Sequence, residues 1–366
     1  MSEKIKLILL SLCLLAGQIA FSQTDKEKAL QKGQEAIKLM DNGNIDRSIA
    51  LLEEAKKLDP DNFIYAYEIA LANYLNKDYK KTVRLLKKLK NHKDINERYF
   101  QLLGNSYDLM GKPEKALKAY DNGLEKFPNS GMIMLEKGNV YLLQEEYDQA
   151  LSYYEQGIKA DPQFPSNYYR ATLMYLNSTE EVWGMIYGEI FMNLERNSAR
   201  TVEISRLLYN TYKSEIEISS DTSASVSFCQ NANILIKDTQ DSDGFKLPFE
   251  MTAYEFTLMI ALQGEDTIDM HALDRIRQDF VSIYYKNDLN KKYPNVLFDY
   301  QKKVLEAGHM EAYNHWILMK GDEEAFHNWH QENQTKWDDF VNWFTENSME
   351  INESKRFYSK QYLNNE

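Results

Sequence analysis

Apolar residues in the first half of the chain recur three and four positions apart between short polar breaks. Leu51, Ala55 and Leu58 show this spacing, which places all three on one face of a helix. Turn-forming residues occupy the breaks at positions 42–44, 111–113 and 144–146. Prolines follow the second helix of three pairs, at Pro60, Pro128 and Pro162. The pattern therefore predicts short helices arranged in pairs.

Two neighbouring stretches, 98–130 and 132–164, carry the same residues at a spacing of 34 positions. The repeated set is Gly104, Tyr107, Ala116, Tyr120 and Pro128, followed by Gly138, Tyr141, Ala150, Tyr154 and Pro162. A fixed period of this length indicates stacked helical hairpins, in which each hairpin buries its apolar face against its neighbours. Such stacks bind other chains and rarely carry chemistry.

This repeating template resembles the tetratricopeptide repeat family. The units begin at Ala29, Phe63, Glu97, Gly131 and Pro165. The third and fourth units match most fully, whereas the second has Thr82 in place of a small residue, and the fifth has Gly188 where an aromatic residue is expected. Small residues in this family lie where the two helices of a hairpin cross, and large residues fill the space between hairpins.

The resemblance implies an all-α fold in two parts. A right-handed α-solenoid of helical hairpins is expected over residues 29–198, with four clear repeats and a degenerate fifth. A smaller helical domain of unknown type is expected over residues 199–366. From Glu181 onward we predict helices near 183–195, 201–216, 250–262, 271–285, 296–306, 310–319 and 323–344. We also predict a serine-rich break over residues 218–225 and a short extended piece within 226–236.

The resemblance also implies a binding groove, because the first helix of each unit lines the concave surface in this family. Its template places twelve residues there: Tyr67, Leu71, Tyr74, Arg98, Gln101, Asn105, Met132, Leu135, Asn139, Leu142, Tyr169 and Leu173. An apolar, tyrosine-rich groove suits a peptide or protein segment. The clamp with which some members bind acidic peptide ends is absent, because Gln101 and Leu135 stand at its lysine positions. In an alternative interpretation, the second half of the same chain covers this groove, and no separate ligand binds there.

One segment of the array is strongly basic. Between Lys77 and Lys88, basic side chains fall three and four apart, opposite Val83 and Leu86. A stripe of this kind could contact anionic lipid at a membrane surface. The interpretation we favour is the solvated outer face of a second helix.

Calcium is the one cofactor that a motif suggests. Residues 239–250 resemble an EF-hand loop, with Asp241, Asp243 and Glu250 at ligand positions. Thr239 stands where a carboxylate is usual, so an ordinary acidic turn is the favoured interpretation.

Two Glu-x-x-His pairs, at 306–309 and 324–327, lie too far apart along antiparallel helices for a di-iron site. No nucleophile or phosphate-loop motif is present in the sequence, so we expect a protein that is not an enzyme.

Charge and the N-terminus bear on location. Residues 1–22 combine Lys4 and Lys6 with a ten-residue, largely apolar run, which predicts an export signal cleaved near Ser22. The mature chain is then expected in the periplasm or outside the cell.

The formal net charge of −13 becomes −14 once the signal, with its net charge of +1, is removed. Such an acidic chain repels phosphate backbones, so we expect no nucleic-acid partner. Only Cys229 would remain, which allows no internal disulfide.

Overall fold

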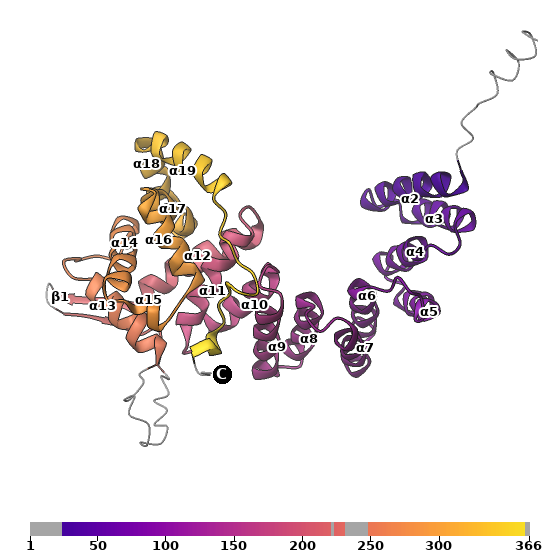
Figure 1. The fold of residues 1–366 in the computed structure, drawn as a ribbon, viewed down its shortest axis with the longest axis horizontal. Coiled ribbons are helices and arrows are strands. Elements are labelled where there is room, and N and C mark those ends of the chain that lie inside the picture. Colours follow the sequence, from indigo (N-terminus) through magenta and orange to yellow (C-terminus); the bar gives the residue numbers. More distant parts are fainter. Residues whose placement is uncertain (1–23, 221–222, 231–247, 363–366) are drawn as a thin grey trace, which may run out of the picture. The chain divides into compact units, whose positions relative to one another are not determined.

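A computed structural model describes residues 24–220, 223–230 and 248–362. The expected signal segment and most of the calcium-loop candidate lie outside these ranges. The described chain is helical apart from one two-stranded sheet, which confirms the all-α fold class. The chain divides into two compact units, residues 1–123 and 124–366. Figure 1 shows the order of the elements in each.

The first unit consists of helices that pack as successive hairpins. They are α2 (Asp25–Asp41), α3 (Ile45–Leu58), α4 (Phe63–Leu75), α5 (Tyr79–Leu89), α6 (Glu97–Asp108) and most of α7 (Pro113–Lys126). The array begins at a capping box, in which the Glu27 amide donates to the Thr24 hydroxyl and the Thr24 amide donates to the Glu27 carboxylate. Ala36 and Ala55 are fully buried where α2 and α3 meet, and Leu52 packs beside them, as the predicted alternation of small and large residues requires.

The turn inside each hairpin has the same conformation in all four clear repeats. One residue per turn has a positive φ: Gly43 (76°), Lys77 (62°), Gly111 (67°) and Glu145 (61°). The following amide donates to the carbonyl five residues earlier, as from Asn44 to Leu39 at 2.8 Å and from Glu146 to Tyr141 at 2.9 Å. This is the Schellman arrangement, which satisfies carbonyls left over at a helix end. The local backbone therefore repeats every 34 residues, as the sequence does.

The second unit continues with hairpins and ends in a larger helical assembly. Its elements are α8 (Gly131–Leu143), α9 (Tyr147–Ala160), α10 (Pro165–Tyr175), α11 (Glu181–Leu194), α12 (Ala199–Glu215), β1 (Ile216–Ser220), β2 (Ser223–Val226), the π-helix η1 (Glu250–Glu255), α13 (Phe256–Ala261), α14 (Met270–Lys286), α15 (Leu289–Lys292), α16 (Val296–Glu306), α17 (Met310–Leu318), α18 (Glu323–Glu332), α19 (Gln334–Glu346) and the 3₁₀ helix η2 (Ser359–Tyr362). One hydrophobic core runs from Ala150 to Phe357, so it crosses the domain boundary expected at residue 198.

Two local predictions in this half are wrong. The serine-rich segment 218–225 is not a break, because β1 and β2 pair as antiparallel strands with Ile216 opposite Val226. Its residues alternate between apolar and polar, the period of a half-buried strand. The helix expected over 323–344 is interrupted at Asn333, whose side-chain amide donates to the Trp329 carbonyl at 3.0 Å and competes with the helical pattern.

Close approach between helices depends on the repeated glycines. A Cβ atom on Gly138 would lie 2.4 Å from Cε1 of Tyr154, and one on Gly104 would lie 2.1 Å from Cε1 of Tyr120. Both tyrosines are buried, on the second helix of the same hairpin. Gly104 and Gly138 therefore occupy equivalent places in adjoining repeats, as the 34-residue period predicts.

Candidate binding surface

The twelve groove candidates all lie on the first helices of hairpins. Tyr67, Leu71 and Tyr74 are on α4, and Arg98, Gln101 and Asn105 are on α6. Met132, Leu135, Asn139 and Leu142 are on α8, and Tyr169 and Leu173 are on α10. Arg98 is exposed and the other eleven are partly buried. Because the structure divides within α7, the two sets are described separately.

In the first unit, α4 packs against α6, and the two helices bring their candidates together. The hydroxyl of Tyr67 donates to the Arg98 carbonyl at 3.4 Å, and its ring stacks on Phe63 with centroids 5.6 Å apart. Burial raises the pKa of Tyr67 to about 12, so the phenol stays protonated at neutral pH. Tyr74 packs edge-on against Tyr79 at 5.4 Å. This surface is aromatic, with the Arg98 side chain exposed beside it.

In the second unit, α8 packs against α10. Leu135, Leu142 and Leu173 lie on these helices with their inner sides against the core, and each keeps an accessible part. Tyr169 is more constrained, because its hydroxyl donates to the Glu203 carboxylate at 2.6 Å. The Arg200 guanidinium lies 5.0 Å from the centre of the Tyr169 ring. Burial, followed by Glu203, raises the pKa of Tyr169. The apolar part of this surface therefore lies chiefly on α8.

The two asparagines have a structural partner that the sequence did not suggest. The Tyr154 hydroxyl donates to Asn139 Oδ1 at 3.0 Å, and the Tyr120 hydroxyl donates to Asn105 Oδ1 in the same way. Each bond joins the two helices of one hairpin directly beside the glycine contact described above. Asn105 and Asn139 thus hold the two helices of their hairpins together. The repeated Gly-Asn pair with a tyrosine fifteen positions after the asparagine was the available signal.

The basic segment forms the outside of a repeat. Lys80, Arg84, Lys87 and Lys88 on α5 are exposed, whereas Val83 and Leu86 are buried in the repeat. The apolar face that a membrane-inserting helix needs is therefore already covered. Across the described parts of the chain, no helix is both long enough and apolar enough to cross a bilayer.

Most of the calcium-loop candidate falls outside the described ranges, including Asp241 and Asp243. Glu250 begins η1, and burial raises the pKa of its carboxyl group. In the two Glu-x-x-His pairs, His309 packs on Trp343 with ring centres 5.2 Å apart, and His327 shares a hydrogen bond with Gln331 at 2.8 Å. Within the described residues, no three His, Cys, Asp or Glu side chains are grouped so that they could hold a metal ion.

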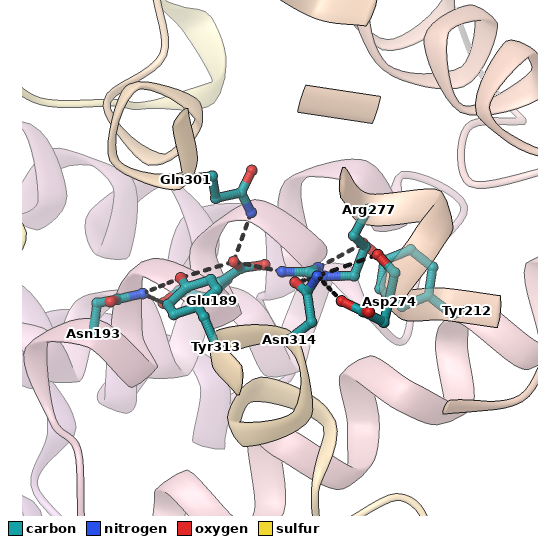
Figure 2. A network of polar contacts seen from close by, with 8 residues as sticks. All are labelled: Glu189, Asn193, Tyr212, Asp274, Arg277, Gln301, Tyr313 and Asn314. Atoms are coloured by element: carbon teal, nitrogen blue, oxygen red, sulfur yellow. Dashed lines mark hydrogen bonds and ion pairs between the residues drawn. The ribbon is translucent and has the colours of Figure 1, made fainter. Parts of the chain in front are cut away.

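A buried polar network in the second unit was missed by sequence reasoning. Figure 2 shows its members: Glu189, Asn193, Tyr212, Asp274, Arg277, Gln301, Tyr313 and Asn314. Glu189 Oε1 accepts hydrogen bonds from Arg277 Nη2 at 2.7 Å, from Gln301 Nε2 at 2.6 Å and from the Tyr313 hydroxyl at 2.9 Å. The available signal was a glutamate and an asparagine four residues apart in α11, a helix that is otherwise apolar on all sides.

Arg277 connects this carboxylate to the rest of the network. Its Nε donates to Asn314 Oδ1 at 2.7 Å and its Nη1 donates to the Tyr212 hydroxyl at 3.0 Å. Burial acts to lower the pKa of Arg277, but Glu189 together with Tyr212 and Tyr313 outweighs it and the pKa is raised, so the guanidinium stays charged. A cavity of about 20 Å³ beside the pair has room for one water molecule, not for a substrate. The network therefore joins α11, α12, α14, α16 and α17 in the core.

Comparison with known proteins agrees with the repeat geometry. The sequence pattern of the tetratricopeptide repeat family matches residues 34–88 and 102–165. Human tetratricopeptide repeat protein 21B is 28% identical over 141 residues, which are 38% of this chain and 10% of the human protein. The TPR repeat-containing protein MJ1428 of Methanocaldococcus jannaschii is 29% identical over 118 residues, 32% of this chain and 21% of that protein. The chain thus spans only a small share of the length of either relative.

Among solved structures, a thermophilic TPR protein of Thermus thermophilus is similar, with 17% identity and a TM-score of 0.42. That alignment covers 49% of this chain and 98% of the Thermus chain. The family match, the 34-residue period and the equivalent glycine contacts in adjoining hairpins agree with one another. Residues 34–88 and 102–165 of this chain are therefore tetratricopeptide repeats.

Proposed function

We propose that this protein is a non-enzymatic adaptor that holds a peptide or protein segment against the first helices of its repeats. Tetratricopeptide repeats generally mediate protein–protein interactions, and proteins built from them are typically scaffolds. The observation that carries the proposal is the exposed hydrocarbon on α8, where Leu135 and Leu142 lie on one helix with part of each side chain accessible. Each large apolar side chain buried by a ligand contributes on the order of 1.5–3 kcal/mol before ordering costs.

One observation favours a partly self-covered groove. Arg200 and Glu203 of α12 contact Tyr169, and Arg200 Nη1 also donates to the Ser166 hydroxyl at 3.0 Å. At this end of the surface, the chain that follows the repeats already supplies partners. In this second candidate, the ligand contacts α8 and stops where α12 begins.

The test is a double variant with a matched control. Leu135→Ala with Tyr169→Ala removes two groove side chains, whereas Leu143→Ala with Tyr147→Ala removes the same two residue types from exposed positions at the α8–α9 turn. We expect the first double variant to lose the partners captured by the wild-type protein, and the control to keep them, with equal helical circular dichroism. Capture of the same partners by both variants would refute a role for this surface.

We also propose that the protein is exported, on the basis of the positive start and apolar run in residues 1–22. Cleavage near Ser22 would leave Gln23 as the first residue. The mass of the mature protein purified from the producing cell checks this directly. A mature chain that still begins at Met1 would contradict export by this signal.

A further inference from the structure

After its last α-helix, the described chain continues as a largely non-helical segment that lies across the second unit. After α19 ends at Glu346, residues 347–358 form no helix, and η2 follows over residues 359–362. Figure 1 shows this yellow segment running from α19 past α11 toward α9 and α10. We call residues 349–362 the strap. Its side chains are buried at four positions, Met349, Ile351, Phe357 and Ser359, with exposed or partly buried residues between them.

The strap is held as a bound peptide would be, through both its backbone and its side chains. Gln163 Nε2 donates to the Ile351 carbonyl at 3.0 Å. Arg356 Nη1 donates to the Lys159 carbonyl at 2.5 Å, and the Tyr362 hydroxyl donates to the Pro294 carbonyl at 2.7 Å. These contacts reach three separate parts of the second unit: the end of α9, the loop before α10, and the loop before α16.

The centre of the site recognises an aromatic side chain. Phe357 is fully buried, and its ring lies 5.9 Å from Tyr187, 6.0 Å from Trp183 and 6.2 Å from Phe249 between ring centres. Rings at these separations pack favourably, and they bury large apolar areas. An aromatic residue in an extended segment is therefore the main anchor of this site.

Two residues further along, the site recognises a hydroxyl group. The Ser359 hydroxyl donates to Glu155 Oε1, a buried carboxylate that also accepts from Tyr175 at 2.7 Å and from Tyr187 at 3.0 Å. The Ser359 amide donates to the Tyr187 hydroxyl at 2.7 Å. A segment with the spacing aromatic-x-serine thus satisfies an apolar pocket and a buried carboxylate at once.

Over most of its length the strap has no helical hydrogen bonds of its own, and such a segment opens more easily than a packed helix. Opening the strap would uncover the pocket around Trp183 and Phe249 and remove a donor from Glu155. The uncovered aromatic surface, and a buried carboxylate that has lost one of its three hydrogen-bond donors, favour rebinding of a similar segment. None of the contacting residues belongs to the groove candidates, so the site is independent of the proposed groove function.

We propose that the surface formed by α9, α10 and α11 together with Phe249 is a second binding site, specific for peptides of the pattern aromatic-x-serine from another protein. The strap is its built-in competitor. In the resting chain the strap occupies the site. A partner segment of the same chemistry binds when the strap opens, and a chain whose strap is weakened binds such a segment more tightly.

The experiment uses the full chain and a fluorescent peptide of residues 350–362. We expect the Phe357→Ala chain to bind this peptide at least tenfold more tightly than the wild-type chain does, measured by fluorescence anisotropy. The Ser359→Ala chain should show a smaller increase, and it serves if Phe357→Ala fails to fold. A peptide that carries Phe357→Ala should bind neither chain, and Glu353→Ala in the chain, at an exposed strap position, should change nothing.

Equal binding of the peptide by the wild-type, Phe357→Ala and Ser359→Ala chains would overturn the proposal. A wild-type chain that sediments as a dimer, and becomes monomeric with Phe357→Ala, would also overturn it. In that case the occupant is the strap of a second copy, and no external segment is needed.

Discussion

A Cβ atom added to Gly138 would lie 2.4 Å from the ring of Tyr154, so only glycine allows these two helices of one hairpin to touch. The Tyr154 hydroxyl then donates to Asn139 beside the glycine. The same arrangement of Gly104, Asn105 and Tyr120 occurs one repeat earlier. This contact sets the distance between first and second helices, and with it the place of the groove side chains on the first helix.

We predict that Gly138→Ala lowers the free energy of unfolding by about 1–3 kcal/mol, the usual effect of an overpacked core position. Urea denaturation of the full chain measures it. Leu143→Ala on the same helix, at an exposed position, is the control and should change stability by less than about 0.5 kcal/mol. Gly138→Ala with full wild-type stability would show that the close contact is not needed.

The positive φ of Glu145 leads to a second prediction. A side chain in this backbone region is disfavoured by about 1 kcal/mol or more, whereas glycine adopts it freely. Because Gly43 and Gly111 occupy the equivalent turn positions, we expect Glu145→Gly to raise the free energy of unfolding by about 0.5–1 kcal/mol. Gln144→Gly, next to it with a φ of −91°, should give no gain. Equal effects of the two changes in thermal denaturation would contradict this explanation.

The buried ion pair between Glu189 and Arg277 should be sensitive to removal of one partner. We expect Arg277→Met to destabilise the protein by about 3–5 kcal/mol, because it leaves the Glu189 carboxylate buried without a cation. Lys291→Met, which removes an exposed pair with Asp288, should have an effect below about 1 kcal/mol. Adding Glu189→Gln to Arg277→Met should recover part of the lost stability, because it removes the unpaired buried charge. A double variant that is less stable than Arg277→Met alone would show that the unpaired carboxylate is not the cause.

Tyrosine burial predicts a loss of stability at high pH. Burial raises the pKa of Tyr154 to about 12, above its ordinary value of 10.0. The unfolded chain therefore releases this proton first, and stability is complete below pH 10 and falls as the pH rises from 10 toward 12. Chemical denaturation across this range should show the decline, and Tyr154→Phe should make it shallower. A stability that stays constant up to pH 12 would contradict the burial of these phenols.

The repeats were predictable from the sequence because each contact that defines them is local. Gly138 meets Tyr154 within one hairpin, and the turn at Glu145 lies between them. The strap and the Glu189–Arg277 network were not predictable, because each joins residues that are far apart in the sequence. Ser359 meets Glu155 from 204 positions away, and Arg277 meets Glu189 from 88. Periodicity carries no information about such pairs.

Two local features were not predicted from the sequence, for different reasons. The hairpin of β1 and β2 was hidden by its serines, although Ile216 and Ile218 alternate as in a strand. The groove asparagines were recognised by position, but their bonds to Tyr120 and Tyr154 require the folded hairpin. The groove residues themselves stay a prediction until a ligand is found.

Site-specific photo-crosslinking would show directly whether a partner binds at the first helices of the repeats. A photoreactive phenylalanine analogue is placed at Leu135 on α8, or at Gln156, an exposed position on α9. After irradiation in the producing cell, we expect a crosslinked protein or peptide from position 135 and none from position 156. The same adducts from both positions, or adducts from position 156 alone, would contradict binding at the first helices of the repeats.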